Sequence, residues 1–193
     1  GVLLVIGTAH ASPPSQQSLS MPVSVDHESN ATLSSISDTP VTRWRWSPNL
    51  ESRWLSDAHE FSVNIGAIIE RSSDEAVSQD RNDPKLEAAW QWADSIDSLR
   101  ARAIFQQASA RTTALEETGQ VVAESTRSTR ALSGAWSHAL NELDSIAIDL
   151  SLQSVSFSKQ VQADFSNTNL STRYTRRFSE LMDGSLSFQS SLY

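Results

Sequence analysis

The sequence contains no cysteine among its 193 residues. Without thiols the chain can form no disulfide framework, no thiolate-ligated metal site and no cysteine nucleophile. Glycine is also scarce, and its six residues are spread along the chain. The glycine-rich loops that cradle phosphates are therefore excluded in their familiar forms. These two absences remove much redox, metal and nucleotide chemistry before any motif is considered.

Basic and apolar residues are both in short supply. The chain has 15 Lys and Arg against 23 Asp and Glu, which gives a net charge of -8. Such an acidic chain is repelled by phosphate, so we expect no nucleic-acid partner. Apolar residues make up 38% of the chain, which argues against a large single core. The abundant serines favour solvated surfaces instead.

Catalytic motifs are missing as well. The four histidines are scattered, and the pair His59 and Glu60 lacks the second histidine of a metalloprotease helix. The segment 134–138 comes nearest to Gly-x-Ser-x-Gly but lacks the final glycine. We therefore expect a non-enzymatic protein with no cofactor and no metal site.

The first eleven residues have two interpretations. An apolar run from Val2 to Ile6 precedes the small residues Ala9 and Ala11, a pattern typical of the end of a secretory signal peptide. The run is too short to span a bilayer as a helix. The alternative is an N-terminal strand. The favoured signal-peptide interpretation predicts a secreted or extracytoplasmic protein.

Residues 12–55 are rich in serine and proline and show no sustained period, so we predict an extended arm. Three tryptophans in it, Trp44, Trp46 and Trp54, are predicted to fix the arm onto the rest of the molecule. The alternative is a cationic and aromatic patch that contacts a membrane interface or a partner.

Two Asn-x-Ser/Thr triplets are candidates for N-glycosylation. They begin at Asn30 and at Asn169. Such triplets arise often by chance and matter only in a eukaryotic secretory route.

A seven-residue repeat runs through residues 115–161. Positions that recur every seven residues share one side of a helix and face a partner helix. We therefore predict a helical interaction seam, and no proline after Pro84 interrupts the segment. The seam residues are Leu115, Val122, Trp136, Leu143, Leu150, Phe157 and Val161.

Part of that segment also fits a strand. Ile146, Ile148, Leu150 and Leu152 alternate strictly with other residues, which is the period of a strand, although the pattern slips before Val155. The seven-residue spacing continues through the slip, and for that reason the helix is favoured over residues 146–157.

Upstream, Asp83 and Pro84 predict a helix start, with Asp as the N-cap and Pro at the first helical position. We predict a mainly α fold of long antiparallel helices, either a helical bundle or a coiled-coil hairpin. The bundle would occupy residues 56–184, with a tail at 185–193.

The predicted function is that of an exported structural or interaction protein. It would assemble through its helices with a protein partner or with itself, and membrane contact remains open. The alternatives are a secreted pathogen effector and an accessory subunit of a large membrane or organelle complex. No residue fixes a substrate, a partner or an oligomeric state.

Overall fold

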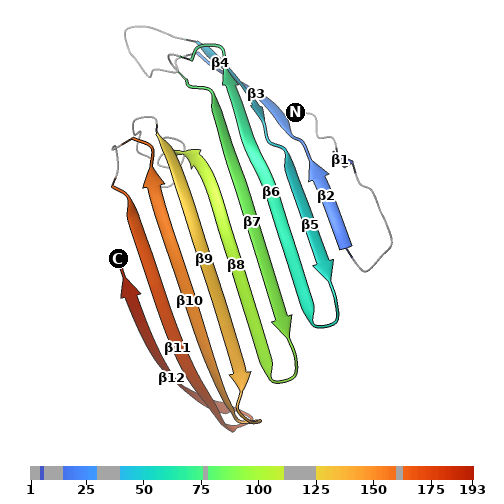
Figure 1. The fold of residues 1–193 in the computed structure, drawn as a ribbon, viewed down its shortest axis with the longest axis vertical. Helices are drawn as coiled ribbons and strands as arrows, with labels where there is room; N and C mark the ends of the chain where they lie inside the picture. The colour runs from blue at the N-terminus through green and yellow to red at the C-terminus, as the bar shows by residue number, and fades with distance from the viewer. Residues whose placement is uncertain (1–4, 7–14, 30–39, 76–77, 111–124, 160–162) are drawn as a thin grey trace.

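The computed structural model describes residues 5–6, 15–29, 40–75, 78–110, 125–159 and 163–193. These residues form one antiparallel sheet of 12 strands (Figure 1). The strands are β1 (Val5–Ile6), β2 (Ser15–Ser20), β3 (Val23–Glu28), β4 (Val41–Trp46), β5 (Asn49–Leu55), β6 (His59–Ser72), β7 (Arg81–Ala93), β8 (Asp97–Ser109), β9 (Thr126–Ala139), β10 (Asp144–Phe157), β11 (Phe165–Ser179) and β12 (Met182–Leu192).

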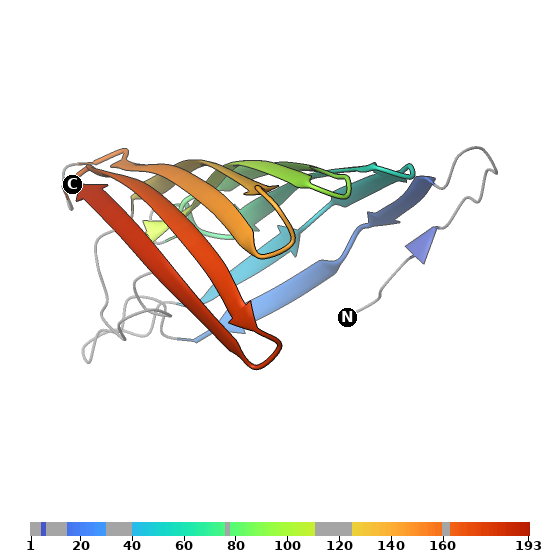
Figure 2. The same ribbon diagram turned by 90° about the horizontal axis from the view of Figure 1, so that it is seen from below.

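From β5 to β12 the sheet is a meander, in which neighbours in space are neighbours along the chain, whereas β2 lies beside β5. The order is β1-β2-β5-β6-β7-β8-β9-β10-β11-β12, while β3 pairs with β4 and β4 also pairs with β6. Antiparallel neighbours need only short turns between them. Figure 2 shows that the sheet is strongly curved into an arch.

The predicted mainly α fold is wrong, because every element of the described residues is a strand. The helical bundle, the coiled-coil hairpin and the helical seam are all contradicted. Among the described residues, no helix is long and apolar enough to cross a membrane.

The spacing of the apolar residues explains the error. A separation of four residues returns a side chain to the same face in a strand and to nearly the same face in a helix. Phe61, Ile65 and Ile69 therefore fit a helical stripe, yet all three lie in β6 on one face of the sheet. Ile68, which completed the stripe, lies on the other face.

Residues 146–157 belong to β10, so the strand alternative is correct for them. Ile146, Ile148, Leu150 and Leu152 share one face. The slip in the alternation is a change of face, since Val155 lies on the opposite side and is 0% exposed.

The predicted helix start at Asp83 and Pro84 is also wrong, because both residues lie in β7. Proline has no N–H to donate, so it fits a sheet only where a ladder bond is not needed. The β7–β8 pairing begins at Lys85, opposite Gln106, which leaves Pro84 outside that ladder. Asp83 binds Arg81 at 2.9 Å instead of capping a helix.

Two prolines interrupt the first long strands at the same level. Pro22 separates β2 from β3, and Pro48 separates β4 from β5. The Ser47 N–H donates to the Pro22 carbonyl at 3.0 Å, and the Ala67 N–H donates to the Pro48 carbonyl at 3.1 Å. These two bonds continue the strand pairing across both prolines.

Strand alternation gives the sheet one apolar face and one polar face. Phe61 pairs with Trp54 on one side and Trp90 on the other, which places an apolar row across three strands. The adjacent row carries Glu60 and Gln91 on the opposite face. The polar face is concave, because polar residues from β6 to β12 line one shared cavity.

The convex apolar face has no cover within the described residues. On both faces of the sheet together, the only buried apolar residues among the described ones are Val41, Ala110 and Val155. Ile65 and Leu132, in the middle of the convex face, are 50% and 52% exposed. The chain exposes 13351 Å², whereas a compact protein of 21.2 kDa exposes about 9,000 Å². The fold therefore buries far less surface than a compact globule does.

Connections differ in length at the two ends of the sheet. At one end they are residues 56–58, 94–96, 140–143 and 180–181. At the other end they are residues 73–80, 110–125 and 158–164. The predicted division at residues 12, 56 and 185 stays a prediction, although β2 to β5 lie within the expected arm.

Candidate functional site

Two neighbouring rows of polar residues run across the concave face. The first row, from β6 to β12, is Glu60, Gln91, Arg100, Ala135, Asp149, Ser171 and Gln189. The second row is Ser62, Ala89, Arg102, Ser133, Ser151, Asn169 and Ser191. Residues in register on adjacent strands stand about 5 Å apart, so each row is a nearly continuous polar strip.

These rows border a cavity of about 510 Å³ in the hollow of the arch. That volume lies within the range of small-molecule sites. The small side chains of Ala89 and Ala135 in its wall leave the space between the longer side chains open. The cavity is the candidate functional site.

Two of the four charged residues that line the cavity, Glu60 and Arg102, are already neutralised. Arg102 donates to Glu87 Oε1 at 2.7 Å. Glu60 accepts from Arg53 at 2.7 Å and from the Gln91 amide at 2.7 Å. These cross-strand bonds fix the side chains at one side of the hollow and leave them little capacity for a ligand.

Arg100 and Asp149 differ from the other charged residues of the wall. Arg100 makes no hydrogen bond or ion pair within the described part of the chain, and Asp149 accepts only a 3.4 Å bond from Ser171. Both lie in the first row, with Ala135 between them. The cavity thus contains one positive and one negative group that lack a charged partner.

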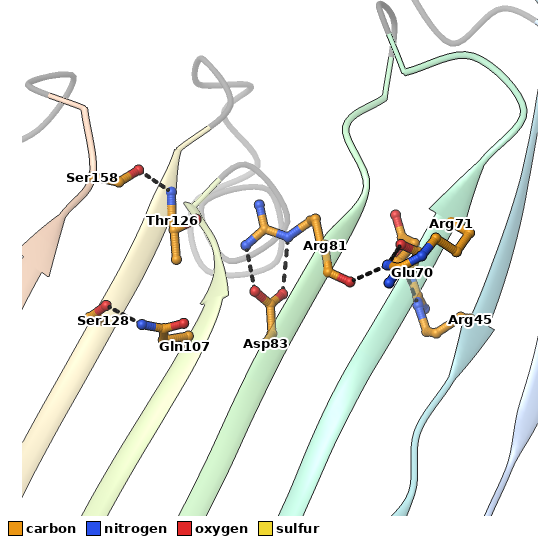
Figure 3. A network of polar contacts seen from close by, with 9 residues as sticks. All are labelled: Arg45, Glu70, Arg71, Arg81, Asp83, Gln107, Thr126, Ser128 and Ser158. Atoms are coloured by element: carbon orange, nitrogen blue, oxygen red, sulfur yellow. Dashed lines mark hydrogen bonds and ion pairs between the residues drawn. The ribbon is translucent and has the colours of Figure 1, made fainter.

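The end of the sheet with the longer connections carries a separate polar network (Figure 3). Arg81 binds Asp83 at 2.9 Å, and these two side chains are only 10% and 8% exposed. Arg45 donates to Glu70 at 3.0 Å, and the Arg71 guanidinium donates to the Arg81 carbonyl at 3.1 Å. These bonds tie β4, β6 and β7 together and serve the fold.

Aromatic side chains gather on the convex face at the end with the short turns. Trp54 stacks on Phe61 with ring centroids 5.3 Å apart. His59 stacks on Trp90 at 6.0 Å. Trp92 lies 6.5 Å from the His59 ring. A band of rings with polar edges thus borders the apolar face at this end.

The aromatic band continues onto β9 through a hydrogen-bonded group. Asp97 Oδ1 accepts from the Trp136 indole at 3.1 Å and lies 2.9 Å from His138 Nδ1. The Trp136 and His138 rings stack at 5.7 Å. No group of three or more potential metal ligands occurs among the described residues, so this Asp and His pair stands alone.

The predicted seam residues that the structure describes do not share one face of the sheet. Trp136 and Leu150 lie on the convex face of β9 and β10, while Phe157 lies on the concave face. Leu143 lies in a turn and is 50% exposed. Leu115, Val122 and Val161 lie outside the described residues. Seven is an odd number, so a seven-residue step changes face in a strand.

The three predicted arm tryptophans all lie on the convex face. Trp44 and Trp46, in β4, are 57% and 43% exposed at the end with the longer connections. Trp54 stacks on Phe61 at the opposite end. They do not fix an arm onto helices, since no such helices exist within the described residues.

The two glycosylation candidates remain predictions. Asn30 lies outside the described residues. Asn169 lies in β11 on the concave face, where its side chain accepts a 2.7 Å bond from Ser191 and donates a 3.5 Å bond to Ser151.

Sequence reasoning missed the cavity residues. A signal for them exists in β8, where Ser98, Arg100 and Arg102 alternate with Leu99 and Ala101. Strict alternation of charge with apolar residues predicts a strand with one wet face. The helical interpretation of this segment obscured that signal.

Known proteins offer no family assignment. No family model, curated protein or solved structure matches this chain.

Proposed function

We propose that this chain is a non-enzymatic, exported structural protein that lies in a lipid bilayer. Its convex face contacts the acyl chains, and its concave face borders water. The observation that carries the proposal is the convex face itself, which is continuous, apolar and uncovered in the described part of the chain. Large exposed apolar surfaces of this kind mark membrane or protein contacts.

The depth of the apolar face supports a bilayer. In β6 the convex positions from Phe61 to Ile69 are all apolar, and His59 and Arg71 border them. Eight residue steps extend about 27 Å along a strand. A tilted strand needs about 9–11 residues to cross the hydrocarbon core. The apolar length of β6 matches that requirement.

The positions of the tryptophans support the same orientation. Trp90, Trp92 and Trp136 border the apolar face at the end with short turns, and Trp44 and Trp46 lie near the opposite end. Tryptophan favours the boundary between acyl chains and head groups, and membrane proteins built of strands carry such belts at both boundaries. Short turns at one end and longer connections at the other are a further feature of such proteins.

A second candidate is an accessory subunit whose apolar face packs against a protein partner. The outer edge of β12 favours it, because no described strand pairs with that edge and it can accept a strand from another chain. The two candidate functions differ in what covers the convex face. In the membrane proposal lipid alone covers it, and in the accessory-subunit proposal a protein partner does.

Liposome flotation of the purified full chain tests the proposal, with a matched pair of variants. Ile65→Arg places a charge in the middle of the convex face, and Ser151→Arg places the same charge on the concave face. An arginine facing lipid near the midplane costs about 2–4 kcal/mol. We expect Ile65→Arg to lose most of its flotation and Ser151→Arg to float like the native chain.

Two outcomes would contradict the membrane proposal. One is a chain that is folded and monomeric in buffer and does not bind liposomes. The other is equal flotation of the two arginine variants, since the convex face would then have no special contact with lipid. Flotation that requires an added protein would favour the accessory subunit.

A further inference from the structure

We propose that the cavity binds a small zwitterion, with Arg100 holding the carboxylate and Asp149 holding the ammonium group. The inference rests on the proposed function, which leaves the concave face open to water. It assigns a ligand class to the cavity, which the membrane proposal does not.

The first argument is that Arg100 and Asp149 have no ion-pair partner among the described residues. Arg102, two residues from Arg100 on the same face, is bound to Glu87, whereas Arg100 contacts no acidic side chain among the described residues. Asp149 likewise has no basic partner there and accepts one long bond from Ser171. The fold therefore satisfies the neighbouring charges and leaves these two available.

The second argument is their separation. Arg100 pairs with Ala135, and Ala135 pairs with Asp149, so the two charged residues are two strands apart in one row. Two strand spacings amount to about 10 Å between backbones. No ion pair joins the two groups among the described residues, and the short Ala135 side chain between them leaves a gap in the cavity wall.

The third argument is the size of the ligand that fits this gap. A charge-assisted hydrogen bond at each end takes up about 2.8 Å. A molecule whose own opposite charges lie a few ångströms apart, as in an α-amino acid, can place one charge against each of the two groups. The planar guanidinium of Arg100 can bind a carboxylate through two parallel bonds.

The other residues next to the gap are polar and uncharged, apart from Arg102, whose charge is already paired with Glu87. Ser133 and Ser151 lie in the second row beside the gap, and Ser171 and Gln189 continue the first row beyond Asp149. Hydroxyl and amide groups can donate to or accept from a ligand without adding net charge. This surface suits a molecule that carries no net charge of its own.

Ligand-observed saturation-transfer NMR on the full chain in detergent micelles tests the site. The probes are L-alanine, propionate and ethylamine, which share a two-carbon scaffold but carry both charges, the carboxylate alone or the ammonium alone. We expect L-alanine to bind at least tenfold more tightly than either single-charge probe.

Two variants separate the roles of the charged residues. Arg100→Gln should weaken L-alanine binding at least tenfold and abolish propionate binding. Asp149→Asn should weaken L-alanine binding at least tenfold and abolish ethylamine binding. Lys85→Gln and Glu51→Gln serve as controls, because they remove charges from the concave face outside the cavity. Circular dichroism checks that each variant keeps the strand content of the native chain.

The inference is overturned if L-alanine binds no better than propionate and ethylamine, or if the controls weaken it as much as Arg100→Gln does. Flotation of the same preparations separates this failure from failure of the membrane proposal. A chain that floats without binding L-alanine keeps its membrane assignment and loses the site. A chain that binds L-alanine but never floats supports the site and contradicts the membrane assignment.

Discussion

At the residue scale, the neighbour on the same or the adjacent strand decides what a charged side chain does. Arg81, Arg102 and Arg100 are the same residue type on the same concave face. The first is held by Asp83 and the second by Glu87, so both stabilise neighbouring backbone positions. Arg100 pairs in register with Gln91 and Ala135, neither of which carries charge, and of these three arginines it is the one with no ion pair among the described residues.

Asp94 illustrates how a turn uses a carboxylate. Its Oδ1 accepts the backbone N–H of Asp97 at 2.7 Å and of Ile96 at 2.8 Å. These bonds, the one from Asp97 first, favour the charged form and hold the pKa of Asp94 below its ordinary value of 3.8. A lowered folded-state pKa adds stability above pH 3.8, and that stability is lost as pH falls through the lower value.

We therefore expect the Asp94 carboxyl to titrate below pH 3.8 in an NMR titration, with the Asp97 amide signal moving at the same midpoint. Asp94→Asn keeps the acceptor oxygen but cannot titrate, so its turn should lose this acid dependence between pH 2 and pH 5. A carboxyl that titrates at 3.8 or above would show that the turn bonds do not form.

At the element scale, the break between β4 and β5 shapes the strand beside it. Gly66 of β6 lies opposite Asn49, directly after the break. A Cβ at Gly66 would lie 2.7 Å from Asn49 Oδ1 and 3.1 Å from the Pro48 carbonyl oxygen. The interruption by Pro48 thus requires the smallest residue on the neighbouring strand.

Gly134 provides a matched comparison, because a Cβ there would meet only the Arg100 carbonyl oxygen at 3.7 Å. Gly134→Ala should raise the free energy of unfolding by about 0.4–1 kcal/mol through lower entropy of the unfolded chain. Gly66→Ala should lower it by about 1 kcal/mol or more through overpacking. Urea unfolding in micelles measures both, and equal effects would contradict the role given to Pro48.

At the scale of the whole molecule, the sheet has an outer strand at its C-terminal side. Within the described residues β12 pairs only with β11, and it contains no lysine, arginine or proline that would protect an exposed edge in water. Inside a bilayer, unpaired backbone groups cost several kcal/mol each. The proposed membrane location therefore requires another strand along the outer edge of β12, from this chain, a longer form of it or a second copy.

We expect amide hydrogen exchange of the vesicle-inserted chain to show that partner strand. Amides of β12 point alternately towards β11 and away from it. If the outer edge is paired, both sets should be protected, and the amides facing β11 serve as the internal control. Rapid exchange of the outward set alone would mean an open edge and would count against burial of β12 in lipid.

The sequence by itself determined the chemical classes that are absent and the alternation that makes the strands. Without cysteine there is no thiolate chemistry, and the run from Ile146 to Leu152 already contained the period of β10. That period did not settle the fold, because Phe61, Ile65 and Ile69 are four residues apart and fit both a helix and a strand.

Only the tertiary structure decided which alternative holds and where the chemistry lies. Arg100 and Asp149 are far apart in the sequence, and pairing through Ala135 of β9 is what places them in one row. Likewise, each strand alone has a polar and an apolar side, but the register of all the strands joins the apolar sides into one face. No described residue covers that face. Cross-strand pairing is a long-range property, so no local pattern in the chain could have supplied it.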